Sequence, residues 1–229
     1  MDQNNIVLTI GPLGITATVV TTWGIVAAIW AMCLLLRPRL RNDPGPLQTV
    51  VEGVVTAQEQ AIAQLVPGEE RRLLPFIGGL WVFLVVANLI GVVPGLGSPT
   101  ADLSATAALA LLVFGSTHWY GIRSQGLRNY LRHYLRPSPI LLPFHIIGEI
   151  TRSVALAVRL FGNMMSLEMA ALLVLLVAGF LAPVPILVLH VIEALVQAYI
   201  FGMLALIYVA GGIQSQRLGA VNHRRSNND

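Results

Sequence analysis

Residues 140–181 read ILLPFHIIGEITRSVALAVRLFGNMMSLEMAALLVLLVAGFL, an apolar run that contains a few charged and polar side chains. At about 1.5 Å per residue, one helix of this length would reach roughly 60 Å, about twice the ~30 Å hydrocarbon core of a bilayer. No proline interrupts the run beyond Pro143. We therefore expect a transmembrane helix that is tilted far more than the ~20° that is usual.

Four more runs are long and apolar enough to cross a bilayer, which takes about 20 residues in a helix. They cover about 6–36, 75–93, 103–122 and 186–213. The first has no basic residue before it and is too long for the apolar part of a signal peptide, so it is interpreted as a span. Only the short 182–185 turn separates the last two spans, so these helices are expected to be antiparallel neighbours.

The composition also indicates a membrane protein. The chain is 55% hydrophobic and 11% charged, whereas soluble domains carry about 25% charged residues. Residues 47–66 are too polar to span but repeat apolar side chains at helical spacing, which predicts an amphipathic helix along the cytoplasmic surface; the alternative is a polar loop. The predicted fold is all-α, a single polytopic membrane domain over residues 1–229 with five transmembrane helices, this surface helix, and a strongly tilted hairpin formed by the last two spans.

All basic residues other than histidine are arginines, and their positions predict the orientation of the chain. Twelve of the 14 lie in connections on one side of the predicted spans or after the last span. Cytoplasmic loops of membrane proteins carry such an excess of positive charge. The N-terminus is therefore expected outside and the C-terminus in the cytoplasm. The remaining two, Arg152 and Arg159, lie inside the 140–181 run.

Charged side chains inside a bilayer cost at least ~2.5–3.5 kcal/mol on insertion scales, so they indicate function by default. Arg159 and Glu168 are nine residues apart, which places them on opposite faces of one helix and about 13 Å apart along its axis. They are not expected to form a local ion pair. Asn163 shares the helical stripe of Arg159. Pairing with a neighbouring helix, purely for stability, is the alternative for both charges, whereas Glu149 and Arg152 are predicted to form a structural ion pair.

The last span has a polar stripe of its own. His190, Glu193 and Gln197 are spaced by three and four residues, so they share one face of an otherwise apolar helix. Counted from the 182–185 turn, Glu168 lies about as deep as Glu193. Carboxylates and an imidazole that converge from facing helices are typical of a proton or cation path. A structural role for a lone histidine is the alternative.

Other site types find little support. Cys33 is the single cysteine and lies in an apolar run, so neither a disulfide framework nor a Cys/His zinc site is indicated. We expect no bound metal and no cofactor. The arginines are not interleaved with aromatic residues in a basic run, which argues against nucleic acid as a partner.

Four strings in the chain are informative together. The most specific is RLFGNM at residues 159–164, with Arg152 seven positions earlier. The others are NLIGVVPG at 88–95, TADL at 100–103 and QAYIF at 197–201. With these strings the chain resembles subunit a of F-type ATP synthases. The compact N-terminal part and the opening at residues 11–13 look like the sodium-linked N-type branch of this family.

The resemblance implies a stator ion channel in a bacterial-type plasma (inner) membrane, with a c-subunit ring, b subunits of the peripheral stalk, the rest of the synthase and lipid as partners. The complex makes or hydrolyses ATP, while this chain alone performs no ATP catalysis. In the family a tilted hairpin lies against the ring, whose carboxylates carry H⁺ or Na⁺. Arg159 matches the essential arginine. Glu168, His190 and Gln197 match pathway positions, Asn163 would help to hold Arg159, and Glu193 is added on geometry alone.

Two other classes of protein compete with this interpretation. A stand-alone secondary transporter would use Arg159 in an anion site, but transporters often contain inverted repeats and broken helices, which this sequence does not display. A membrane scaffold that transports nothing would have no use for buried charges. The sequence leaves open which of H⁺ and Na⁺ is carried, because ring residues largely set that choice.

Overall fold

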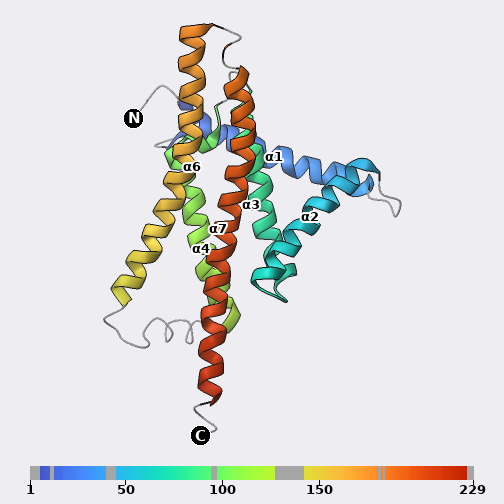
Figure 1. Ribbon diagram of the computed structural model, residues 1–229, viewed down its shortest axis with the longest axis vertical. Helices are drawn as coiled ribbons and strands as arrows, with labels where there is room; N and C mark the ends of the chain where they lie inside the picture. The colour runs from blue at the N-terminus through green and yellow to red at the C-terminus, as the bar shows by residue number, and fades with distance from the viewer. Residues whose placement is uncertain are drawn as a thin grey trace.

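The computed structural model describes residues 6–10, 13–39, 45–93, 97–126, 142–179, 182 and 184–225, and these are almost entirely helical (Figure 1). Within this part of the chain, five helices are long and apolar enough to cross a membrane. The predicted all-α membrane fold with five spans is therefore confirmed. The spans are Ala17–Leu35, Glu70–Ile90, Leu103–Arg123, Ile146–Ala178 and Val184–Ile213.

The N-terminal segment differs from the prediction. Strands β1 (Ile6–Ile10) and β2 (Leu13–Thr16) pair antiparallel, and helix α1 (Ala17–Leu36) begins only after them. The predicted start of the first span at residue 6 is therefore wrong. The residues concerned are rich in β-branched types, and a Gly-Pro pair, as at 11–12, is unfavourable inside a helix, so a hairpin is the better local solution.

The remaining elements follow the predicted order, with shifted ends. Helix α3 begins at Glu70, five residues before the predicted start at Pro75. A proline in the second turn removes one backbone hydrogen bond but does not end the helix. Residues 140, 141, 180 and 181, at the ends of the predicted 140–181 span, and residue 183 of the predicted turn lie outside the described residues. The elements are η2 (Arg37–Arg39), α2 (Pro46–Leu65), α3 (Glu70–Ile90), η3 (Pro99–Ala101), α4 (Leu103–Gln125), α6 (Leu142–Ala178) and α7 (Val184–Arg225).

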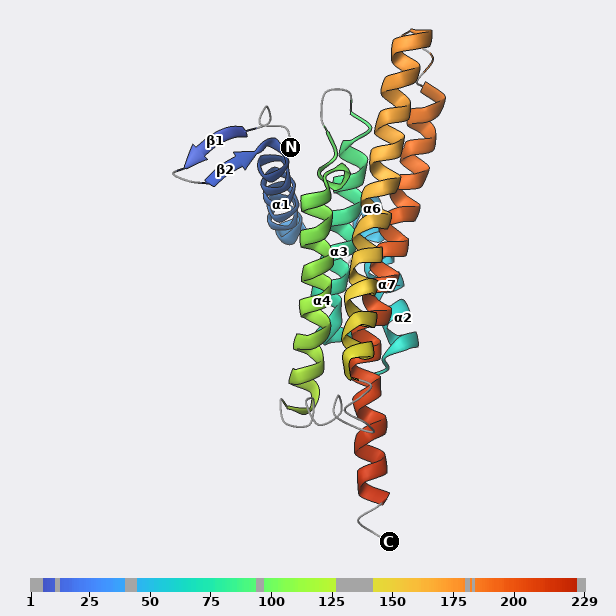
Figure 2. The same cartoon turned by 90° about the vertical axis from the view of Figure 1, so that its left-hand side faces the viewer.

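Helices α3, α4, α6 and α7 run along the long axis of the molecule, and α7 packs against the other three (Figures 1 and 2). Helices α6 and α7 form the predicted hairpin. Helix α1 crosses this bundle at a steep angle and α2 returns from its far end (Figure 1). The hairpin β1–β2 lies at the opposite end of α1 (Figure 2).

The lengths of the helices determine how the hairpin fits a bilayer. The apolar stretch of α6 has 33 residues and that of α7 has 30, so at ~1.5 Å per residue they reach roughly 50 and 45 Å. If the whole apolar stretch of α6 lies inside a bilayer core of ~30 Å, the helix is inclined by about 50°. Helix α1, at about 30 Å, is long enough to cross the same core without inclination.

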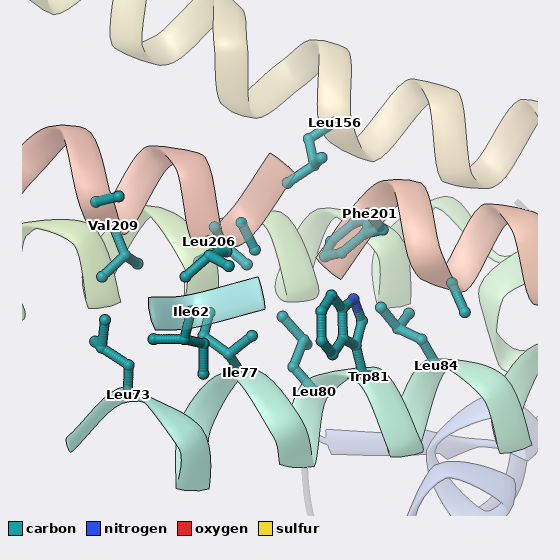
Figure 3. Close-up of a cluster of buried hydrophobic side chains, with 14 of the residues drawn as sticks. Ile62, Leu73, Ile77, Leu80, Trp81, Leu84, Leu156, Phe201, Leu206 and Val209 are labelled. Carbon is teal, nitrogen blue, oxygen red and sulfur yellow. The ribbon is translucent and has the colours of Figure 1, made fainter. Parts of the chain in front are cut away.

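An apolar core joins α2 and α3 to α6 and α7 (Figure 3). Trp81 of α3 is 8% exposed and lies directly on α7. A Cβ atom at Gly202 would overlap the Trp81 indole ring, so glycine is required for this close approach. Leu156 of α6 reaches the same core, which fixes the hairpin against α3.

Helix α2 is amphipathic, as predicted. Ile62 is fully buried against the core, while Val50, Val51, Val54 and Val55 are exposed. Gln58 is 8% exposed and approaches Gly78 of α3. One end of α2 is thus fixed to the bundle, and its other end presents apolar side chains. Its location at the cytoplasmic surface stays a prediction.

Candidate functional site

Arg159 lies near the middle of α6 with an exposed side chain. One turn further along, Asn163 Nδ2 donates a hydrogen bond to Gln197 Oε1 of α7 at 2.8 Å. Gln197 is 1% exposed. The structure therefore brings two of the predicted site residues together, one turn from the arginine and across the α6–α7 contact.

A second cluster surrounds Gly91, at the end of α3. The Glu168 carboxylate of α6 accepts a hydrogen bond from the Ser98 backbone N–H at 2.8 Å. A Cβ atom placed at Gly91 would lie 3.1 Å from Glu168 Oε1 and 3.3 Å from His190 Cε1. Glu168 and His190 thus converge from α6 and α7. Glu193 is half-buried on α7, one turn from His190 on the same side of the helix.

A buried polar network that was not predicted from the sequence supports this cluster. Asn88 Nδ2 donates to the Ala194 carbonyl oxygen at 3.1 Å, and Asn88 Oδ1 accepts from the Thr100 hydroxyl at 2.7 Å. The hydroxyl oxygens of Thr100 and Ser98 are 2.6 Å apart, and the Ser98 hydroxyl donates to the Ala87 carbonyl at 2.9 Å. The network fixes the loop that presents the Ser98 N–H to Glu168. Asn88, a polar side chain inside a span, was the available signal.

Two buried nitrogen atoms stand out in these clusters. His190 is 1% exposed, and neither His190 Nε2 nor Gln197 Nε2 has a hydrogen-bond partner among the described residues. A buried polar atom without a partner costs about 1–3 kcal/mol, and each such atom in a folded protein calls for an explanation.

A third polar group lies at the other end of α6. His118 Nε2 of α4 is 3.2 Å from Glu149 Oε2 of α6. The guanidinium carbon of Arg152 lies 5.1 Å from the ring centroid of Tyr208 in α7. Glu149 and Arg152 therefore both contact other helices, and an ion pair between them stays a prediction. The contact of His118 with Glu149 was not predicted from the sequence.

Asp102 connects α1 to the start of α4. Its Oδ1 accepts hydrogen bonds from the backbone N–H and the hydroxyl of Ser104, and Oδ2 accepts from the Thr18 hydroxyl, each at 2.8 Å. Burial raises the pKa of Asp102, but these hydrogen bonds stabilise the carboxylate, and the net pKa lies below its ordinary value. Asp102 is thus an ionised N-cap that also fixes α1.

No group of three or more His, Cys, Asp and Glu residues in the described part of the chain is arranged to hold a metal ion. The site consists instead of one exposed arginine between two sets of titratable side chains. Such an arrangement suits ion transfer without covalent chemistry.

Comparison with known proteins decides the family. The model of the ATP synthase A chain family matches residues 19–210. ATP synthase subunit a 2 of Pelobacter propionicus is 64% identical over 206 residues, which is 90% of both chains. ATP synthase subunit a 1 of Hahella chejuensis is 67% identical over 207 residues, 90% of this chain and 88% of the relative. This chain belongs to the ATP synthase subunit a family.

A further relative, ATP synthase subunit a of Legionella pneumophila, is 54% identical over 216 residues and 91% of both chains. The family match includes all of α3, α4 and α6 and most of α7. All predicted site residues of this subunit a therefore lie inside the matched region. The resemblance predicted from RLFGNM at 159–164 is confirmed.

Proposed function

We propose that this chain is the stationary ion-channel subunit of a rotary F-type ATP synthase, in which Arg159 separates two offset half-channels. Membership of the ATP synthase A chain family is the observation that carries the assignment. The chain is accordingly a membrane subunit of an enzyme complex. We infer that ATP chemistry takes place in the soluble head of that complex and not in this chain.

The surroundings of Arg159 support docking of a rotating ring. Ala155, Gly162 and Ser166 share the helical stripe of Arg159. A Cβ atom at Gly162 would meet no atom within 4 Å. Small residues allow helices to approach closely inside a membrane. A helix of the c ring can therefore bring its carboxylate near Arg159.

The chemistry of arginine explains how the ring would discharge its ion. A guanidinium group stays protonated at physiological pH and attracts carboxylates through a planar fork of donors. Arg159 would therefore favour the ionised form of a ring carboxylate, which releases its ion. A fixed positive charge also blocks direct passage of cations between the half-channels. Ions then have to travel with the ring, which couples their flow to rotation.

The two clusters receive different roles. Glu168, His190 and Glu193 would line the outer half-channel, where their proximity lets them share protons or cations. Asn163 and Gln197 would keep Arg159 in position from the α6–α7 contact, supported by their 2.8 Å hydrogen bond. The network of Asn88, Thr100 and Ser98 would hold Glu168.

Partners and location follow from the same proposal. We infer that the whole chain, residues 1–229, forms one membrane domain that contacts a c ring and peripheral-stalk b subunits in a bacterial-type inner membrane. The distribution of the arginines supports an outside N-terminus and a cytoplasmic C-terminus. Assignment to the sodium-linked N-type branch stays a prediction. A stand-alone transporter with an arginine-based anion site is not favoured, because the chain belongs to the subunit a family.

Purification tests the assignment. A tagged version of this chain should bring with it a c ring and a soluble ATPase head from solubilised membranes, in a complex whose ATP hydrolysis drives ion transport after reconstitution. A chain that purifies alone and transports an anion would contradict the proposal.

Kinetics in the same vesicles test the outer half-channel. Glu168→Gln should slow transport more than Glu193→Gln, and the two changes together should be non-additive, because the groups belong to one cluster. Additive effects, or a neutral Glu168→Gln, would place the outer half-channel elsewhere.

A further inference from the structure

The pair between α4 and α6 combines an acid and a base away from the outer cluster. His118 Nε2 and Glu149 Oε2 are 3.2 Å apart, and the two side chains remain 29% and 27% exposed. His118 Nδ1 is 2.9 Å from the Phe114 carbonyl oxygen. A carbonyl oxygen only accepts, so Nδ1 carries a hydrogen and Nε2 faces the carboxylate. The pair can thus hold one proton between Nε2 and Oε2 and release it to water.

Its position along α6 mirrors that of the outer cluster. Glu149 precedes Arg159 by ten residues and Glu168 follows it by nine. At ~1.5 Å per residue, the two carboxylates lie roughly 15 Å and 13 Å from the arginine in opposite directions along the helix. At about 100° per residue they also lie on different faces. One contacts α4 and the other contacts the Ser98 loop.

Other charged and titratable groups near the pair come from each adjoining helix. Arg152 is one turn beyond Glu149 on α6 and lies over Tyr208 of α7. Arg123 lies at the end of α4, five residues beyond His118 and on a different face of the helix, with an exposed side chain. An ionised Glu149 carboxylate can accept a proton from His118 or from solvent.

We propose that His118 and Glu149 form a second proton-exchange site, on the arginine-rich side of Arg159, where protons pass between the ring and the cytoplasm. The inference rests on the proposed function, since it assigns residues to the inner of the two half-channels. The competing explanation is a structural contact that only holds α4 against α6. Such a contact would not make transport depend on the pH of one side.

The test uses the complete complex in vesicles, with the soluble head facing the medium. The rate of ATP-driven proton uptake is measured while the pH of the medium is varied and the pH of the lumen is held constant, and then the reverse. Glu149→Gln keeps the shape of the side chain and a hydrogen bond to His118 but cannot release a proton. His118→Gln removes the imidazole. Ser116→Ala, on the same helix as His118, is the matched control.

Both Gln variants should lower the rate at least fivefold and flatten its dependence on the pH of the medium, with the lumen-side profile unchanged. The double variant should be no slower than the slower single variant, since either change disables the site. Ser116→Ala should behave as wild type. Wild-type rates and profiles in Glu149→Gln, or equal changes on both sides, would overturn the proposal.

Two further variants keep the outcome decisive. If Glu149→Gln complexes do not assemble, the double variant His118→Glu/Glu149→His, which exchanges the two side chains, is measured instead. Assembled complexes of this variant whose uptake rate does not depend on the pH of the medium would overturn the inner site. Arg159→Ala in the same vesicles distinguishes a failure of the inner site from a failure of the proposed function. Loss of pumping there, with wild-type behaviour of Glu149→Gln, would refute the inner site alone. Retained pumping in Arg159→Ala would refute the proposed function itself.

Discussion

Replacement of Gly91 by alanine tests whether the outer cluster requires its observed geometry. Gly91 has φ −62° and ψ −15°, ordinary right-handed helical values, so alanine introduces no backbone strain. The added methyl group would lie 3.0 Å from Ser98 Cβ, 3.1 Å from Glu168 Oε1 and 3.3 Å from His190 Cε1. These distances are shorter than the ~3.5–4.0 Å of an ordinary contact between carbon atoms. One of the three neighbours must move.

The size of the effect follows from what would be displaced. Overpacking a tight site costs about 1–3 kcal/mol. Movement of Glu168 also weakens its hydrogen bond from Ser98, and hydrogen bonds to charged groups contribute about 1.5–3 kcal/mol. If about 1.4 kcal/mol of this loss appears in the barrier to ion transfer, transport becomes roughly tenfold slower. The complex should still assemble, because the change lies at the end of α3 and not in the apolar core.

The assay is ATP-driven ion transport in reconstituted vesicles, normalised to the amount of assembled complex. Gly79→Ala is the control, because it makes the same change on α3 at an exposed position with no atom within 4 Å of the added Cβ. Gly79→Ala should transport as wild type. Wild-type transport in Gly91→Ala, or equal slowing in both variants, would refute the idea that Glu168 and His190 act in a tightly packed site.

Three other predictions concern the connections around the site. Asp102→Ala should lower the free energy of unfolding by about 1 kcal/mol in thermal melts, because α4 loses its N-cap; in the native chain this stabilisation is present above pH 3.8, the ordinary pKa, and is lost as the pH falls through the lower pKa of the folded state. Asn163→Ala and Gln197→Ala should each slow transport, and a double variant that is additive would contradict a shared role through their hydrogen bond. In a cysteine-free background, Gly97→Cys and Pro67→Cys, both exposed, should react with impermeant reagents from opposite sides of the membrane; labelling from one side would refute the topology.

Hydrophobic length and helical periodicity predicted most of the helical architecture. A span needs a run of apolar residues, and such a run is directly visible in sequence, as it is around Arg159. The stripes of α6 and α7 were predictable because residues three and four apart share a face. The contact of Asn163 with Gln197 follows once two such stripes face each other across a short turn.

What the sequence did not reveal depends on contacts between distant segments. Glu168 accepts a hydrogen bond from the backbone N–H of Ser98. A backbone donor cannot be identified from the side-chain types in a sequence. His118 and Glu149 are far apart in sequence and meet only because α4 packs against α6. The β1–β2 hairpin was missed because a hydrophobic run at a chain end resembles the start of a span whether it is extended or helical.

The most direct test of the proposed function is ATP-driven ion transport by complexes that carry Arg159→Ala or Arg159→Lys. Both variants should assemble, because the side chain is exposed on α6 and contributes little to the core. Neither should couple ATP hydrolysis to transport: alanine removes the charge, and lysine lacks the planar fork and can lose its proton when desolvated. Absent coupling in both, with normal amounts of assembled complex, is the predicted result. Wild-type coupling in either variant would contradict the role proposed for Arg159.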